Sequence, residues 1–158
     1  MSVKNIESLL RTLRLPTAAK DLEEVLASQK KAVNTSWVEE LLSREVDHRR
    51  EKSLQMRIKS ARFPELKNID SFDWDFNPEI NRDKIEELSD MSFLEKNKII
   101  LLLGQPGTGK THIALSLALQ AVCRGERVFC TSLKRLIQEI RIAKERNTLD
   151  SLFKKILS

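Results

Sequence analysis

The sequence predicts an α/β domain over residues 67–158, preceded by an all-α domain over residues 1–66. Two observations predict this fold. Residues 99–103 form an unbroken apolar run, typical of a strand buried on both faces, and a glycine-rich loop and a helical segment follow it. In residues 6–61, by contrast, apolar side chains recur every three or four positions, which is the spacing of one helix face.

The loop after the apolar run fits the phosphate-binding pattern G-x-x-x-x-G-K-[S/T] at every fixed position. The strand before it and the helix after it are the context that this pattern requires. A glycine-rich turn without a ligand is the less favoured alternative. The second domain is therefore predicted to be a P-loop NTPase, with nucleotide-contacting residues Gly104, Gln105, Pro106, Gly107, Thr108, Gly109, Lys110 and Thr111.

The residue types in this loop explain the chemistry. Gly107 and Gly109 can adopt backbone angles closed to other residues, so that successive N–H groups point inward and form an anion-binding nest. The start of a helix adds partial positive charge there. Lys110 supplies a full charge for the β- and γ-phosphates, and the Thr111 hydroxyl is placed to ligate Mg²⁺. We expect a nucleoside triphosphate site with Mg²⁺ as cofactor; these residues do not distinguish ATP from GTP, and ATP is the nucleotide that the family resemblance described below implies.

Three helices are predicted in the first domain. The first ends at Leu15-Pro16, because proline cannot continue a helix, and the second runs from about Thr17 until residues 34–36 interrupt the pattern. Ser36 stands three residues before Glu39, which is the spacing of a capping box and predicts the start of the third helix.

The third helix becomes strongly basic after Val46, and the chain carries a formal net charge of +5. A basic helix can lie along nucleic-acid phosphates. The alternative is a solvated helix with i,i+4 ion pairs such as Glu45–Arg49. The charge pattern is compatible with both alternatives. We favour DNA contact chiefly because of the family resemblance described below, with candidate residues Arg49, Arg50, Lys52, Arg57, Lys59 and Arg62.

The remaining elements of the second domain follow from local signals. Aromatic and acidic residues alternate over residues 72–76, which predicts an extended segment with buried aromatics, although one of them could flank an adenine ring. Asn77-Pro78 is predicted to start a helix that runs through Leu88. After a turn at Gly125, residues 127–131 are predicted to form a second strand, Ser132 to cap the next helix, and residues 149–156 to form a last one.

The two cysteines, Cys123 and Cys130, match no metal-ligand spacing, and we interpret both as buried thiols in a reducing compartment. The sequence has no apolar signal segment at its start and no run long enough to cross a membrane. A cytoplasmic protein that contacts no membrane is therefore expected.

The sequence resembles the IstB-like ATPases, AAA+ helpers of insertion-sequence transposition that are related to DnaC-type helicase loaders. The matching stretches are residues 69–78, residues 104–114 and residues 125–129. The resemblance implies an AAA+ core, ATP binding, DNA binding through helical modules, oligomerisation on DNA and partnership with a transposase. Within this pattern His112 is interpreted as structural.

The chain departs from the family pattern at its end. Family members continue into an apolar strand ending in Asp-Glu, the Walker B site that holds Mg²⁺, followed by a sensor residue and an arginine finger. The printed sequence stops at Ser158 before such a strand, so only the first part of the AAA+ core is expected and no catalytic residue is proposed. Segments 99–103 and 128–131 should then stay apart with exposed edges or pair in a way foreign to the family.

Several functions fit these observations. The first is a transposition ATPase that binds Mg-ATP and DNA with little or no hydrolysis. The second is a non-enzymatic fragment that binds DNA or a transposase and whose loop is vestigial. A helicase loader acting in DNA replication would use the same loop, and a remnant without function is the fourth interpretation.

Overall fold

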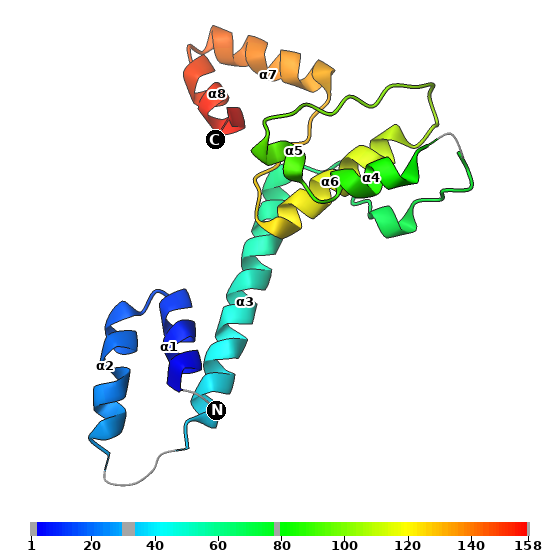
Figure 1. The fold of residues 1–158 in the computed structure, drawn as a ribbon. Coiled ribbons are helices and arrows are strands. Elements are labelled where there is room, and N and C mark those ends of the chain that lie inside the picture. The colour runs from blue at the N-terminus through cyan, green and yellow to red at the C-terminus, as the bar shows by residue number, and fades with distance from the viewer. Residues whose placement is uncertain (1–2, 30–33, 78–79, 158) are drawn as a thin grey trace. The chain divides into compact units, whose positions relative to one another are not determined.

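The computed structural model describes residues 3–29, 34–77 and 80–157 (Figure 1). These residues divide into two compact units, Met1–Ser53 and Leu54–Ser158, and the division falls inside the long helix α3, Ser36–Ala61. The predicted domain boundary after residue 66 lies further along the chain, beyond the end of α3, and stays a prediction.

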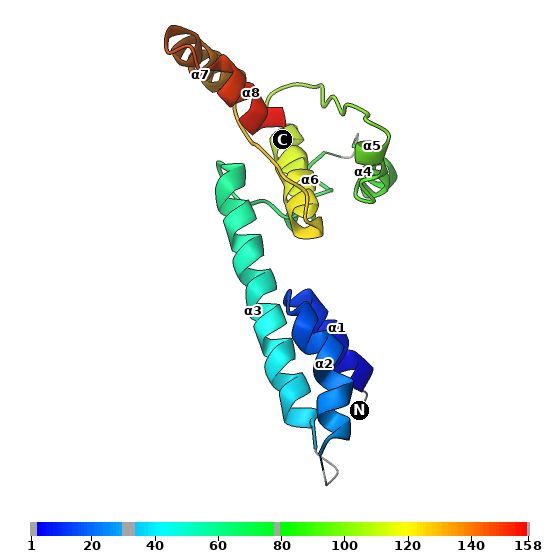
Figure 2. The same cartoon turned by 90° about the vertical axis from the view of Figure 1, so that its left-hand side faces the viewer.

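The first unit consists of α1, Val3–Thr12, α2, Pro16–Ala27, and the first part of α3. Within this unit, α1 and α2 lie side by side along α3 (Figure 2). Ile6, Leu10 and Ala19 are buried between them, and Leu22, Val38 and Leu42 pack against this cluster. The helices lie where the apolar spacing predicts them, but only part of each predicted apolar face is buried, because Val25 of α2 and Trp37 and Leu41 of α3 are exposed.

The start of α3 differs from the predicted capping box. The Ser36 hydroxyl bonds to the Asn34 side chain at 2.7 Å, and the Glu39 carboxylate accepts a hydrogen bond from Asn5 at 3.0 Å. Asn34 also accepts the Ser36 N–H, at 3.0 Å. The capping-box prediction is therefore wrong, because an Asn side chain two residues upstream satisfies the Ser36 N–H and hydroxyl.

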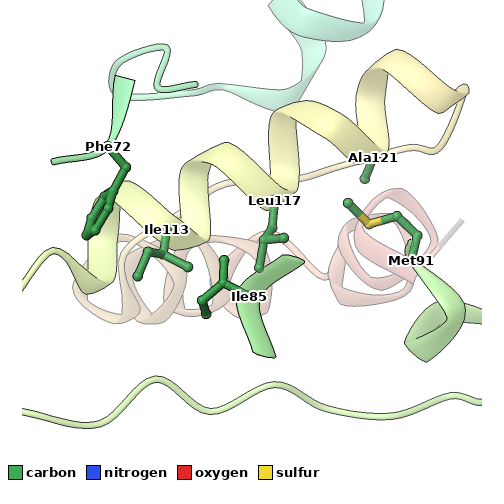
Figure 3. Packing of buried hydrophobic residues seen from close by; sticks show 6 residues of the cluster. All are labelled: Phe72, Ile85, Met91, Ile113, Leu117 and Ala121. Carbon is green, nitrogen blue, oxygen red and sulfur yellow. The ribbon is translucent and has the colours of Figure 1, made fainter. Parts of the chain in front are cut away.

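The second unit is organised around α6, Lys110–Arg124. Ile113, Leu117 and Ala121 follow one face of α6 and point toward Ile85 and Met91 (Figure 3). Ile85 belongs to α4, Arg82–Leu88, and Met91 directly precedes the short helix α5, Ser92–Glu95. Burying this face removes apolar surface from water and stabilises α6 in its position.

α4 begins later than predicted. Its N-cap is Asn81, whose side chain accepts the Lys84 N–H at 2.9 Å. A helix start at Asn77-Pro78 is therefore wrong, and Pro78 itself lies outside the described residues. Asn81 can offer a side-chain acceptor to the first helical turn, and this capping decides where the helix begins.

The described residues contain no β-strand, so the two predicted strands are not formed in this chain. Segment 99–103 alternates instead: Ile100 and Leu102 are half-buried against the α6 cluster, whereas Ile99, Leu101 and Leu103 are 87%, 77% and 87% exposed. In segment 127–131, the Cys130 N–H bonds to the Ala61 carbonyl at the end of α3, at 2.8 Å. Without a laddered neighbour, an extended segment gains no strand hydrogen bonds and covers only one of its faces.

The carboxyl-terminal part contains α7, Leu133–Glu145, and α8, Leu149–Leu157. Ser132 caps α7 by accepting the Arg135 N–H at 3.3 Å, and Gly125 ends α6 with a φ of 104°, so both predictions are confirmed. In the part of the chain that the structure describes, no helix is both long and apolar enough to span a bilayer.

The turn between α4 and α5 is fastened to the end of α6. The Arg124 guanidinium donates to the carbonyls of Ser89, at 2.8 Å, and Asp90. The Asp90 carboxylate accepts the Ser92 N–H at 2.7 Å, and this bond, with nearby positive charge, lowers the pKa of Asp90. These contacts keep α4 and α5 against the apolar face of α6.

The two cysteines have different environments. Cys130 is half-buried, and burial raises the pKa of its thiol. Cys123 is exposed, so the prediction that both thiols are buried is wrong for Cys123. Cys123 lies in the last turn of α6, after Val122, the last buried residue of this helix.

We expect a maleimide to label Cys123 faster than Cys130 at neutral pH, because the thiolate is the reactive species and Cys130 is less exposed with a raised pKa. Mass spectrometry of the native protein over time measures the two rates. The single variants Cys123→Ser and Cys130→Ser assign each rate to one thiol. In 6 M urea the two thiols should react at equal rates. If they also reacted at equal rates in the native protein, the described environments would be contradicted.

Candidate functional site

The glycine-rich loop connects the extended segment 98–103 to α6. Gly107 and Gly109 have φ values of 83° and 82°, in the left-handed region that favours glycine. Gly109 is the N-cap of α6, and Lys110 is the first helical residue. The N–H groups of the first helical turn have no partner within the helix, so the loop ends at a set of donors with partial positive charge.

The Lys110 side chain folds back over the loop. Its ammonium group donates to the Gln105 carbonyl at 2.5 Å and to the Thr108 hydroxyl at 3.1 Å. The Thr108 hydroxyl in turn donates to the Gln105 carbonyl at 2.9 Å. The full positive charge is thereby held at the loop, beside the donors of the first helical turn.

A cavity of about 810 Å³ adjoins the loop. Six of the predicted loop residues line it, Lys84 adds a second ammonium group, and none of its described lining residues is acidic. Apolar side chains make up much of the remaining wall: Phe76, Ile80, Ile85, Leu88, Ile100, Leu102 and Ile113. The cavity therefore combines a cationic, donor-rich part with an apolar part.

Some of the predicted loop residues line the cavity and others do not. Gly104, Gln105, Pro106, Gly107, Thr108 and Lys110 line the cavity. Gly109 and Thr111 are outside its described lining, and Thr111 is exposed on the first turn of α6. No group of three or more His, Cys, Asp or Glu side chains suited to a metal occurs among residues 3–29, 34–77 and 80–157.

Gly109 lies directly against an aromatic ring. A Cβ atom at this position would approach Phe72 Cε2 and Cζ at 2.6 and 2.7 Å, closer than Cβ atoms come to other atoms in proteins. Phe72 is 7% exposed and forms edge contacts with Trp74, at 4.8 Å between ring centroids, and with His112, at 5.1 Å. The sequence alternation predicted a buried Phe72, but it gave no sign that Gly109 is its partner.

Phe76 contradicts the prediction that all three aromatics of residues 72–76 are buried. It is 69% exposed and lines the cavity. The reason is local: the Asp73 carboxylate accepts the N–H groups of Asp75, at 3.1 Å, and Phe76, at 3.2 Å. The resulting turn interrupts the extended alternation before Phe76.

The predicted DNA-binding residues of the first unit lie on the surface of α3. Arg49 bonds to Glu45 at 2.6 Å and to the Leu13 carbonyl at 3.2 Å. Arg50 is 3.8 Å from Asp47, and both side chains are 74% exposed. Lys52 is exposed as well. Exposed ion pairs of this kind contribute little to stability, so these side chains can exchange partners.

The predicted DNA-binding residues of the second unit divide into two groups. Lys59 is exposed. Arg57 donates to the Val122 carbonyl near the end of α6 at 3.2 Å. Arg62 bonds to Glu139 of α7 at 2.9 Å and lies over the Phe129 ring at 5.2 Å. Both arginines are half-buried and hold neighbouring segments of this unit together.

Comparison with known proteins shows the family in which this loop occurs. The family model of the IstB-like ATP binding proteins matches residues 8–158. The chain belongs to this family. The family implies a P-loop NTPase fold, in agreement with the loop and α6, although the described residues contain no strand.

The relatives of this IstB-like chain are named for insertion sequences. A protein of insertion sequence IS21 from Pseudomonas aeruginosa, named for ATP binding, is 35% identical over 92% of this chain and 56% of its own length. Similarly named proteins of IS5376 from Geobacillus stearothermophilus and IS232 from Bacillus thuringiensis are each 31% identical, over 59% and 62% of their lengths. The chain therefore spans somewhat more than half the length of these relatives.

The two glycines provide a matched test of the loop packing. Both have left-handed φ values, but a Cβ at Gly107 meets no atom within 4 Å, whereas a Cβ at Gly109 meets the Phe72 ring. Gly107→Ala should cost about 1–2 kcal/mol of stability from backbone strain alone. Gly109→Ala should cost about 1–3 kcal/mol more, because the ring must move. Urea unfolding measures both variants.

The double variant Phe72→Ala, Gly109→Ala controls this experiment. Removing the ring also removes the clash, so the two substitutions should be non-additive. Equal losses for Gly107→Ala and Gly109→Ala, together with additivity in the double variant, would contradict the contact.

Proposed function

We propose that this chain binds Mg-ATP through its glycine-rich loop and serves as an ATP-binding helper of DNA transposition. The observation that carries the proposal is the loop itself. Two left-handed glycines lead into the N-terminus of α6, and Lys110 lines a cavity whose described lining residues include no Asp or Glu. This combination of donors and positive charge suits a polyphosphate.

Each loop residue has a role in this proposal. The backbone of Gly104, Gln105, Pro106, Gly107, Thr108 and Gly109 would surround the phosphates. Lys110 would exchange its contacts with Gln105 and Thr108 for the β- and γ-phosphates. The exposed Thr111 hydroxyl would ligate Mg²⁺, which supplies charge neutralisation of the phosphate oxygens when bound.

The apolar part of the cavity would receive the base. Ile80, Ile85 and Leu88 can cover one face of a purine, and the exposed Phe76 offers an aromatic surface for stacking. A cavity of about 810 Å³ is within the range of small-molecule sites.

Binding, rather than turnover, is the proposed activity of these 158 residues. Hydrolysis of a nucleoside triphosphate requires a residue that orients the attacking water. None of the described residues lining the cavity is an Asp or Glu, so none can take that role. We therefore propose that hydrolysis is weak or absent in this stretch of the protein.

The first test is thermal unfolding with and without Mg-ATP. At about 100 times its Kd, the ligand should stabilise the folded state by about 2.7 kcal/mol. Lys110→Ala should abolish the increase in melting temperature, because the loop loses its full charge. Lys144→Ala, on the exposed side of α7, is the matched control and should retain the increase.

Two other results would contradict nucleotide binding in different ways. A cooperative transition that Mg-ATP does not shift would favour a non-enzymatic binding module with a vestigial loop. The absence of any cooperative transition would favour a remnant without function.

We also propose that the basic side chains of α3 and its end, Arg49, Arg50, Lys52, Arg57, Lys59 and Arg62, contact DNA. The relatives named for insertion sequences support a role in transposition rather than in replication, and a transposase and further copies of the protein on DNA are the proposed partners. Within the set, the exposed side chains Arg49, Arg50, Lys52 and Lys59 should contribute more than the half-buried Arg57 and Arg62.

Salt dependence of DNA binding tests this assignment. Each lost phosphate contact should reduce the slope of log Kobs against log salt by about 0.9 on duplex DNA. Lys52→Ala and Lys59→Ala should each show this reduction without a change in melting temperature. Lys20→Ala, exposed on α2, is the control. An unchanged slope in both variants would contradict DNA contact by α3.

A further inference from the structure

The segment before the loop contacts the start of α6 at two points. The His112 Nε2 atom lies 2.9 Å from the Asn68 carbonyl oxygen. Because a carbonyl oxygen only accepts hydrogen bonds, Nε2 carries the proton and donates. Four residues beyond Asn68, the Phe72 ring packs against Gly109 and forms an edge contact with the His112 ring.

We propose that Asn68, Phe72 and His112, which we call the aromatic clamp, position the phosphate-binding loop for its ligand. The inference rests on the proposed nucleotide site and adds positioning residues to it. His112 and Phe72 are outside the described lining of the cavity, so the clamp acts through Gly109 and the first turn of α6 rather than by touching the phosphates.

The clamp is anchored on both sides. The Asn68 carbonyl also accepts the Ser71 hydroxyl, at 2.8 Å, and the Ser71 N–H, at 3.2 Å, in the short helix η1, Ile69–Ser71. Phe72 belongs to the same buried cluster as Ile113 and Leu117 of α6. The ring that limits Gly109 is therefore fixed by packing on α6 and by the hydrogen bonds of η1.

Glycine is the residue with the largest conformational freedom, so a loop that depends on glycines must be ordered when it binds. Phe72 occupies the space beside Gly109, whereas no atom lies within 4 Å of a Cβ at Gly107. The clamp thus restricts the loop at Gly109, where α6 begins, and does not restrict it at Gly107. Ordering this part before binding lowers the entropic cost of capturing phosphate and tightens binding.

The test compares His112→Ala with His112→Gln by titration calorimetry, using Mg-ATP and inorganic pyrophosphate as probes. His112→Ala removes the donor. The loss of one hydrogen bond should raise the Kd of both probes about three- to tenfold. The Gln side chain can donate to the Asn68 carbonyl, so His112→Gln should restore both affinities to within about twofold of the original protein.

A spectroscopic readout separates positioning from stability. In a Trp37→Phe background, Trp74 is the remaining tryptophan, and it contacts Phe72 at 4.8 Å between ring centroids. Pyrophosphate should change Trp74 emission when the clamp is intact, and the change should be reduced in His112→Ala and recovered in His112→Gln. Melting temperatures of all variants are measured alongside, in the absence of ligand.

The outcomes distinguish the two proposals. If the original chain binds neither Mg-ATP nor pyrophosphate, the proposed nucleotide site is wrong, and the proposed clamp, which rests on it, is wrong as well. If the original chain binds both and His112→Ala binds them equally tightly, the clamp is overturned while the site stands. Equal weakening in His112→Ala and His112→Gln would also overturn it, because the hydrogen bond would then not be the cause.

Discussion

The burial of one face of α6 is the interaction on which the second unit depends. Ile113, Leu117 and Ala121 lie against Ile85 and Met91, and the half-buried side chains of segment 99–103 cover the same cluster. Because α6 starts directly after the glycine-rich loop, this burial also fixes the helix N-terminus, whose first residue, Lys110, lines the cavity. Core packing and the candidate site are therefore not separable in this unit.

Positive charge has two uses in this chain. Arg57 and Arg62 hold α3 to the end of α6 and to α7 through a carbonyl, a carboxylate and an aromatic ring. Lys52 and Lys59 lie on the surface of the same helix. The sequence alone does not show which basic residues hold segments together and which lie on the surface. The partners of the two arginines are more than 60 residues away in the chain.

The family and the local structure agree on the loop and differ on the sheet. An IstB-like protein implies a P-loop NTPase fold, yet segments 99–103 and 127–131 are extended without pairing in the described residues. Alternate side chains of segment 99–103 remain exposed. Exposed apolar edges of this kind favour association with another extended segment.

The sequence by itself determined the features that depend on neighbouring residues. It gave the glycine-rich loop, the helix after it, the Ser132 cap and the Gly125 end, because backbone freedom and capping act over a few positions. Only the tertiary structure decided the features that depend on distant partners. Phe72 packs on Gly109, His112 bonds to Asn68, and the apolar run does not become a strand, because packing, hydrogen bonding and strand pairing are set by residues far away in the chain.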